Sequence, residues 1–323
     1  MRKVQGRRMG KHPDIIALGE PLYELSSTEE GDLGSAKSFQ VGFGGDSSNF
    51  AVAAARSGGC VGYLTRLGAD SFGDALIDLW EREGIDHSHV VRDKDAKTGI
   101  YFISRGNGEH SFTYYRADSA ASRMQPGFFP DAYIAEAKLL HISGISQAIS
   151  DSARATTIRA MEVARESGTL ISYDTNLRLN LWPLEQARET IHHAASLCDI
   201  FLPSHDDVTR LTGLEDPKAI IDFYLELGVR TIVLKIGGEG ALLAHEGGIE
   251  HVPGFPAEQV DASGAGDCFC GAFVAKLISG HSMRDSVRYA CAAAAISVTG
   301  LGAVPSFPRQ EAVKAKFPEV EGV

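Results

Sequence analysis

A turn near the C-terminus, residues 261–267, carries the strongest chemical signal in the sequence. It reads D-A-S-G-A-G-D and leads into an apolar run, 268–279, that has the length of a helix. Its two glycines remove side chains, so the first N–H groups of the helix can bind an anion beside the positive end of the helix dipole. Asp267 adds a carboxylate that can accept a proton from a hydroxyl. A helix N-cap would explain Asp267 alone, but not the glycines and the second acid, Asp261.

The elements that must position this turn alternate between strands and helices. Short apolar runs predict strands, and apolar residues at helical spacing predict helices. Repeated β–α units argue for an α/β protein with a mostly parallel sheet and helices on both faces. The strands are expected at 14–19, 61–67, 138–142, 170–174, 199–202 and 231–236, and the helices at 46–57, 71–83, 151–166, 184–197, 206–211 and 217–227.

Two stretches, 23–39 and 97–116, break this alternation because they lack a helical period. Within the second, 99–103 and 110–115 resemble paired strands around the turn Gly106-Asn107-Gly108. An inserted hairpin of this kind can form a flap over a site, or it can lie at the edge of the sheet and complete it. The pattern leaves both interpretations open.

The composition excludes several classes of protein. The 323 residues contain 31 Lys and Arg against 42 Asp and Glu, a net charge of −11, which is opposite to the balance of a nucleic-acid-binding chain. No apolar run approaches the roughly 20 residues of a membrane helix. The 5 cysteines form no CxxC pair, which argues against a disulfide framework and for a reducing cytoplasm. The basic residues 1–12 are predicted to be a disordered start and not a signal peptide.

Four motifs resemble those of the ribokinase-like (PfkB) carbohydrate kinases and follow in the same order. D-A-S-G-A-G-D at 261–267 is similar to the family's D-T-x-G-A-G-D, and F-G-G-D-S-S-N at 43–49 resembles its sugar-binding turn G-G-x-x-x-N. K-I-G-G-E-G at 235–240 resembles the nucleotide loop K-x-G-x-x-G, and L-G-A-D-S-F-G at 67–73 resembles the turn L-G-x-D-x-x-G. Alone, the glycines of 237–240 would indicate a plain hairpin turn. The resemblance covers residues 14 to 308.

This resemblance implies a ribokinase-like three-layer fold with a small β lid. It implies one kinase domain over 13–318, with the lid contributed by 22–39 and 97–116. The implied cofactors are ATP and Mg²⁺, and a monovalent cation such as K⁺ has a candidate site near Asp261 and Ser263. The implied location is the cytoplasm, without nucleic-acid or membrane partners, and the lid strands are a candidate surface for forming a homo-oligomer.

Three further segments are similar to motifs of 2-keto-3-deoxygluconate kinases. They are the Y-Y-R that ends at Arg116, H-I-S-G-I at 141–145, and the D-T-N-L-R that ends at Arg178 shortly before Leu181-Trp182. A sugar acid suits this pattern, because a guanidinium group can bind a carboxylate with two parallel hydrogen bonds. A surface salt bridge is the alternative for either arginine. Leu177 stands where those kinases often carry Tyr, which leaves the identity of the sugar acid open.

The same resemblance assigns roles to individual residues. Asp267 is the expected base, and Gly264, Ala265 and Gly266 form the expected anion hole. The expected sugar ligands are Gly44, Gly45, Asn49, Tyr101, Tyr114, Arg116, Asn176 and Arg178. The expected nucleotide ligands are Ser204, Lys235, Gly237, Gly238, Gly240, Gly264, Gly266 and Cys291.

The family's magnesium motif, N-x-x-E, appears here as S-H-D-D at 204–207. Asp207 can still hold the ion through water, because magnesium keeps several waters when it binds to proteins. Ser204 in place of Asn departs from the family pattern. An acidic first turn, which the helix dipole stabilises, explains Asp206 and Asp207 equally well.

The expected function is ATP-dependent phosphorylation of a sugar acid at a terminal hydroxyl, with 2-keto-3-deoxygluconate as substrate and its 6-phosphate as product. A fructokinase or another neutral-sugar kinase is the alternative within the family. The fold alone would also permit an NAD-dependent oxidoreductase, but Gly19-Glu20-Pro21 stands where a G-x-G-x-x-G loop would be needed. The intact Asp267 argues against a sugar-binding protein without activity.

Overall fold

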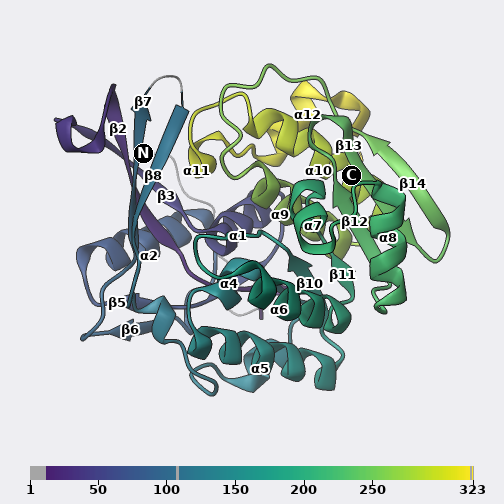
Figure 1. Cartoon of the computed structure of the whole chain (residues 1–323), viewed down its shortest axis with the longest axis horizontal. Helices are drawn as coiled ribbons and strands as arrows, with labels where there is room; N and C mark the ends of the chain where they lie inside the picture. The colour runs from purple at the N-terminus through teal and green to yellow at the C-terminus, as the bar shows by residue number, and fades with distance from the viewer. Residues whose placement is uncertain (1–11, 107–108, 321, 323) are drawn as a thin grey trace.

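A mostly parallel sheet forms the centre of the molecule (Figure 1). The structure is a computed structural model that describes residues 12–106, 109–320 and 322, so the disordered start predicted for 1–12, apart from His12, and the centre of the turn at 106–108 lie outside the described residues. Among its described strand pairs, β12–β13 and β13–β14 are antiparallel and the others are parallel. In spatial order the strands are β14 (Gly248–Pro253), β13 (Gly240–His245), β12 (Thr231–Lys235), β11 (Ile200–Phe201), β10 (Leu170–Asp174), β9 (Leu139–Ser143), β1 (Ile15–Leu18) and β4 (Val61–Leu64).

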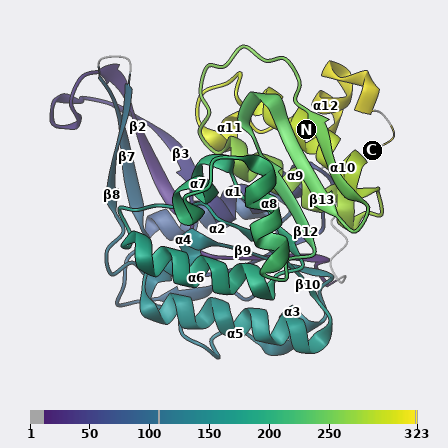
Figure 2. The ribbon, with the colours of Figure 1, turned by 45° about the vertical axis from the view of Figure 1, so that its right-hand side comes forward.

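Helices cover both faces of this sheet and create two hydrophobic cores (Figures 1 and 2). Successive side chains of a strand point to opposite faces, and β1 shows this directly. Ile15 and Ala17 join the first core, whereas Ile16 and Leu18 join the second. The first core includes α1 (Asp46–Arg56), α2 (Ser71–Glu83), α9 (Ala265–Ile278), α10 (Met283–Ser297), α11 (Ala303–Ser306) and α12 (Gln310–Lys316); the second includes α3 (Asp131–Ala135), α4 (Gly144–Ala148), α5 (Asp151–Ser167), α6 (Leu184–Leu197), α7 (His205–Thr212) and α8 (Pro217–Glu226).

A separate sheet stands beside this body, at the left in Figure 1. We call it the side sheet; its strands, in spatial order, are β3 (Phe39–Gly44), β2 (Leu22–Glu30), β7 (Ile100–Gly106) and β8 (Glu109–Tyr115). Strands β7 and β8 pair antiparallel, which confirms the predicted hairpin. Because β7 pairs with β2 and neither strand joins the central sheet, the interpretation as an edge hairpin that completes the sheet is wrong.

The strand predicted at 61–67 is divided in the structure. Strand β4 pairs with β1, whereas β5 (Arg66–Gly68) leaves the central sheet and pairs with β6 (Val91–Asp93). Thr65, which lies between them, is fully buried, so the chain stays buried where the strand partner changes. No helix among the described residues is both long and apolar enough to cross a membrane.

Candidate active site

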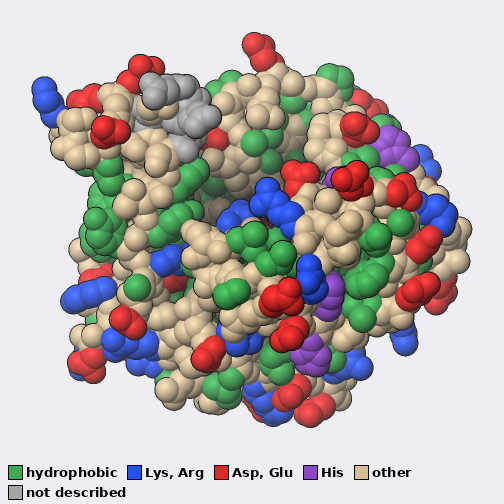
Figure 3. Space-filling view, in the orientation of Figure 1, with side chains coloured by type: hydrophobic (Ala, Val, Ile, Leu, Met, Phe, Trp, Pro, Cys, Tyr) green, Lys and Arg blue, Asp and Glu red, His purple; other side chains and the backbone are tan. Residues whose placement is uncertain are grey.

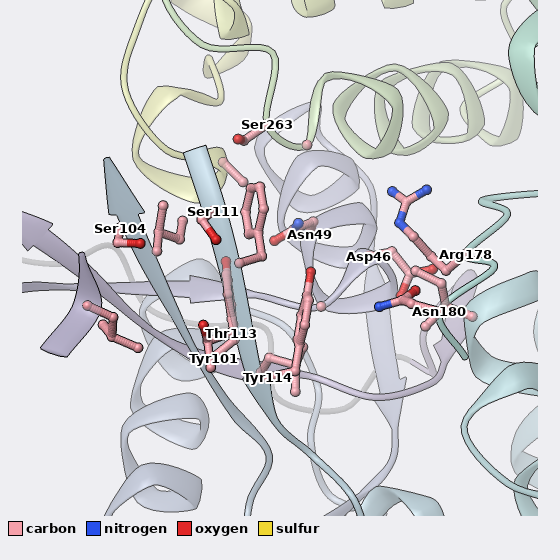
Figure 4. A pocket seen from close by; sticks show the side chains of 18 of the residues that line it. Asp46, Asn49, Tyr101, Ser104, Ser111, Thr113, Tyr114, Arg178, Asn180 and Ser263 are labelled. Carbon is pink, nitrogen blue, oxygen red and sulfur yellow. The ribbon is translucent and has the colours of Figure 1, made fainter. Parts of the chain in front are cut away.

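A cavity of about 950 Å³ lies between the side sheet and the body. Figure 3 shows the hollow, with Lys or Arg side chains along its lower edge. In Figure 4 the side-sheet residues lie on one side of the cavity and Arg178 and Asn180 on the other, with Asn49 between them. The side sheet contributes Tyr101, Ile103, Ser104, Ser111, Phe112, Thr113 and Tyr114, and the body contributes Gly45, Asp46, Asn49, Asn176, Arg178, Asn180, Ser263, Gly264 and Asp267.

Helix α9 begins three residues earlier than the sequence pattern predicts, at Ala265. Its N-cap is Gly264, which has φ +70°, a left-handed conformation that suits glycine. Asp267 therefore lies in the first turn of the helix, and its interpretation as an N-cap is wrong. The N–H group of Ala265 already donates to Ala262 O at 3.1 Å. The N–H groups of Gly266 and Asp267 have no backbone acceptor among the described residues, so these two remain available to an anion.

Two amide side chains hold the half-buried Asp267 carboxylate. Asn49 Nδ2, from α1, donates to Asp267 Oδ2 at 2.9 Å, and Asn176 Nδ2, after β10, lies 3.4 Å from Asp267 Oδ1. Burial raises the pKa of Asp267, and the negative charges of Asp46 and Asp174 add to this effect, while the hydrogen bond from Asn49 and the charge of Lys235 oppose it. The carboxylate is therefore a stronger proton acceptor than an ordinary aspartate, as the removal of a proton from an alcohol requires.

The paired glycines Gly44 and Gly45 allow side sheet and body to meet closely. Gly45 has φ +87°, and a Cβ there would collide with the backbone oxygen of Glu20. A Cβ on Gly44 would collide with the hydroxyl of Tyr101. The glycines thus bring the start of α1, which carries Asn49, against the cavity.

The tyrosines of the side sheet form one wall of the cavity. Tyr101 and Tyr114 stack with ring centroids 5.5 Å apart. Tyr101 is buried and donates its hydroxyl hydrogen to Glu24, whereas Tyr114 is 39% exposed. Burial and the neighbouring Glu24 raise the pKa of Tyr101, so this hydroxyl stays protonated.

The two predicted carboxylate ligands, Arg116 and Arg178, have different environments. Arg116 forms an ion pair with the fully buried Glu20 and does not line the cavity. Arg178 is exposed and lines the cavity, and its Nη1 donates within its own loop to Leu177 O at 2.8 Å. Among the side chains that the structure describes, Arg178 is the arginine that lines this cavity. Leu177 itself is buried in the second core.

A second cavity, of about 440 Å³, contains most of the predicted nucleotide ligands. Residues 237–239 form a short 3₁₀ turn between β12 and β13, so the glycine loop lies at the tip of a hairpin. The cavity also has an apolar wall that a flat heteroaromatic ring would fit. Its lining includes Lys235, Gly237, Gly238, Gly240, Gly266 and Cys291 with the apolar Phe255, Phe269, Ala294, Ala295 and Val298.

A third cavity, of about 780 Å³, connects the other two around the start of α9. It shares Asn176 and Asp267 with the first cavity and Gly237 and Gly266 with the second. Lys235 contributes a buried cation to its wall, with Nζ 2.9 Å from Asp174 Oδ1 and 3.3 Å from Cys270 Sγ. Burial opposes the charge on Lys235, but Asp174 outweighs it and raises the pKa, so the side chain remains cationic. A chain of phosphates would meet this charge and the free N–H groups together.

The residues predicted to hold magnesium line this third cavity. Ser204 caps α7, because its hydroxyl accepts from Asp207 N–H at 3.3 Å. Asp207 Oδ2 accepts from the Thr175 hydroxyl at 3.0 Å and from Leu177 N–H at 3.1 Å. Among the described residues no group of three or more acidic, His or Cys side chains could hold an ion directly. The carboxylates present therefore fit an ion held mainly by phosphates and water.

Asp261, the candidate ligand for a monovalent cation, supports the turn that precedes α9. Asp261 Oδ1 accepts from Ser263 N–H at 2.9 Å, and Oδ2 accepts from Gly302 N–H at 2.9 Å. These contacts tie the turn to the segment before α11. The cation itself stays a prediction.

Several polar residues of the site were not identified from the sequence. Asp46 and Asp174 stand inside motifs that were identified, and Asn180 lies two residues after one, whereas Glu20 and Glu24 belong to no motif. Their importance comes from burial and from partners that are distant in the chain. They are Glu20, Glu24, Asp46, Asp174 and Asn180.

Comparisons with known proteins agree with this arrangement. The family described as pfkB family carbohydrate kinase matches residues 12–310. The 2-dehydro-3-deoxygluconokinase of Thermoproteus tenax is 36% identical, over 95% of this chain and 97% of its own. The probable fructokinase-7 of Arabidopsis thaliana is 32% identical, over 93% of this chain and 91% of its own. The crystal structure of a putative ribokinase II from E. coli, in complex with ATP and Mg²⁺, has a TM-score of 0.88 and 26% identity, and the match covers 95% of this chain and 99% of that one.

Proposed function

The chain belongs to the PfkB family of carbohydrate kinases and is a sugar kinase, and from this premise we propose that its substrate is a sugar acid. The reaction would transfer the terminal phosphoryl group of ATP to the terminal hydroxyl of 2-keto-3-deoxygluconate, giving the 6-phosphate. The observation that carries the proposal is the position of Arg178, whose guanidinium group lines the cavity that contains Asp267. The relatives that act on 2-dehydro-3-deoxygluconate, the same compound under another name, support it.

Phosphoryl transfer mainly requires positioning and neutralisation of charge. Asp267, oriented by Asn49 and Asn176, would accept the hydroxyl proton of the sugar. The N–H groups at the start of α9 and the ammonium group of Lys235 would stabilise negative charge on the phosphoryl group in transfer. Mg²⁺, when bound with ATP, would neutralise the phosphate oxygens, with Asp207 holding it through water. In this arrangement Asp267 is the residue that accepts the proton, and the other groups position the reactants or neutralise charge.

The remaining assignments follow from the three cavities. The second cavity would hold the adenine ring, with Gly237, Gly238, Gly240 and Cys291 around it. The phosphates would pass through the third cavity, beside Ser204 and Lys235. A K⁺ ion near Asp261 and Ser263 would add positive charge at the same place. The sugar would lie in the first cavity against Gly44, Gly45, Asn49, Tyr101, Tyr114, Asn176 and Arg178. Arg116 would influence sugar binding indirectly, through its ion pair with Glu20 at the junction of side sheet and body.

A neutral-sugar kinase such as a fructokinase is the second candidate. The similarity to fructokinases favours it, and so does the position of Arg116, which pairs with Glu20 and does not line the cavity. An assay that couples ADP release to NADH oxidation, run over a panel of sugar acids and neutral hexoses, separates the two. We expect the highest kcat/KM on a sugar acid. A neutral hexose with the highest value would replace the proposal with the second candidate.

We also propose that residues 13–318 form one kinase domain in which the side sheet is a lid. A lid should be more mobile without ligand and should close when substrate binds. Backbone amides of β7 and β8 should therefore exchange with deuterium more slowly when sugar and a non-hydrolysable ATP analogue are both saturating. Amides of β10, inside the central sheet, serve as the control and should not change. Equal exchange in β7 and β8 with and without ligands would contradict the lid role.

The outer face of the side sheet suits contact with a second copy of the chain. Phe39, Phe102 and Tyr115 make edge contacts on this face, with ring centroids 5.5 and 5.7 Å apart, and Val41 is 49% exposed beside them. Exposed apolar sheet faces of this kind favour association. We expect a dimer in sedimentation velocity, and monomers for the double variant Val41→Glu/Tyr115→Glu. The control Leu225→Glu, on α8, should remain dimeric, and a wild-type monomer at micromolar concentration would contradict the proposal.

A further inference from the structure

Asp46 is a buried carboxylate that none of the roles above uses. It is the first residue of α1, directly after Gly45, and its side chain lines the cavity while only 7% of the residue is exposed (Figure 4). Its Oδ1 atom has no hydrogen-bond partner among the described residues. A buried carboxylate oxygen without a donor destabilises a fold, so its presence in the site calls for a functional reason.

One amide group connects Asp46 to the expected base. Asn176 Nδ2 lies 3.4 Å from Asp46 Oδ2 and 3.4 Å from Asp267 Oδ1. Asn176 has φ +32°, a conformation that is uncommon for a non-glycine residue and that brings its side chain between the two acids. Helices α1 and α9, which carry the two acids, pack closely against each other: a Cβ on Gly271 of α9 would lie 2.8 Å from Ala54 N of α1. The backbone positions that carry the two carboxylates are thus held close to one another.

We infer that Asp46 is a positioning residue for phosphoryl transfer: with Asn176, it orients Asp267 and strengthens it as a proton acceptor. This inference rests on the proposed role of Asp267 as the base. Two neighbouring carboxylates that interact titrate as a pair, and the charge of one favours the protonated form of the other. A proton taken from the sugar is therefore held more strongly by Asp267 when Asp46 is ionised.

Other groups around Asp46 and Asp267 also influence the pKa values of these two carboxylates. Burial raises the pKa of Asp46 itself, hydrogen bonding by the Ser143 side chain and the Ser47 backbone opposes this effect, and the charges of Asp174 and Arg116 add to it and oppose it respectively. Removing the Asp46 charge leaves these other groups in place, so the test isolates one interaction. The groups that face the pair are Glu20 after β1, Tyr63 on β4, Tyr101 on β7, Arg116 after β8, Asp174 on β10, Lys235 on β12, and Cys268 and Cys270 on α9.

The experiment measures kcat/KM for the sugar against pH in the wild type, Asp46→Asn, Asp46→Ala and Asp46→Glu. The base must be ionised to act, so activity rises with pH through its apparent pKa. Without the neighbouring charge, ionisation of Asp267 is easier, and the acidic limb should move by about one pH unit toward lower pH in Asp46→Asn and Asp46→Ala. Their maximal kcat should fall about three- to tenfold, because a weaker base transfers the proton less readily. Asp46→Glu keeps the charge and should retain the wild-type limb.

Asp151→Asn is the matched control, because Asp151 is the first residue of α5 and its side chain is 91% exposed. It should leave the profile unchanged. An unshifted acidic limb in Asp46→Asn, combined with a raised KM for the sugar, would overturn the inference and make Asp46 a ligand of a sugar hydroxyl.

A second measurement does not require activity. In protein labelled with ¹³C at the aspartate carboxyl carbons, the signals of Asp46 and Asp267 should titrate in linked steps. In Asp267→Asn the signal of Asp46 should titrate at lower pH, because the linkage is reciprocal. Independent titration of the two carboxyls would overturn the inference even if the proposed base role is correct. Linked titration in a protein whose Asp267→Asn variant keeps its turnover would instead show that the proposed base role has failed.

Discussion

Replacing Asp267 by Asn is expected to abolish turnover and largely to spare binding. Asparagine keeps the size of the side chain, so Asn49 and Asn176 still meet a polar group of the same shape. It cannot accept the proton of the sugar hydroxyl, and a positioned general base contributes about 10²- to 10⁴-fold to the rate. The measurements are kcat in the ADP-release assay and the dissociation constants of the sugar and of a non-hydrolysable ATP analogue, by calorimetry.

The control for this variant is Asp285→Asn. Asp285 is the third residue of α10, as Asp267 is of α9, but it is exposed and its carboxylate accepts a hydrogen bond from Ser282. Its replacement should leave kcat unchanged. If Asp267→Asn keeps more than about a tenth of the wild-type kcat, less than about 1.4 kcal/mol of transition-state stabilisation has been lost, and the base role is wrong.

Replacing Arg178 by Met should reduce kcat/KM for a sugar acid by about 10- to 150-fold. The loss of one charge-assisted hydrogen bond costs about 1.5–3 kcal/mol, and the substrate carboxylate would be left without its partner. A neutral hexose has no such group, so its kcat/KM should change little. The test measures both substrates with the wild type and the variant. Equal losses on both would mean that Arg178 shapes the site or binds phosphate, and the fructokinase-like alternative would then lead.

Arg116→Met is the matched comparison, because the same change is made to an arginine that pairs with Glu20 and not with the cavity. It leaves a buried carboxylate without its counter-ion, which typically costs about 3–5 kcal/mol. We expect a lower midpoint of unfolding in urea and similar losses of kcat/KM on both substrates. A loss confined to the sugar acid would show that Arg116 leaves Glu20 and binds the carboxylate directly.

The sequence by itself determined the regular elements and the order of the chemical motifs. The predicted ranges 71–83, 170–174 and 184–197 coincide with α2, β10 and α6. Such elements are encoded locally: for α2, Asp70 accepts a hydrogen bond from Gly73 N–H at the start, and Gly84 ends the helix in the left-handed conformation. The glycine pairs and Asp267 were equally visible, because their types and spacing carry the chemistry. That each assigned residue binds the sugar or the nucleotide stays a prediction.

Only the tertiary structure decided which of these residues meet. Arg116 and Arg178 have the same chemistry in the sequence, yet Glu20 pairs with the first and leaves the second to the cavity. The change of strand partner at Thr65 and the link from Asp46 through Asn176 to Asp267 were likewise hidden. The physical reason is the same in each case. A buried charge or strand edge takes the partner that the packing of distant segments brings to it, and no local pattern of residue types contains that information.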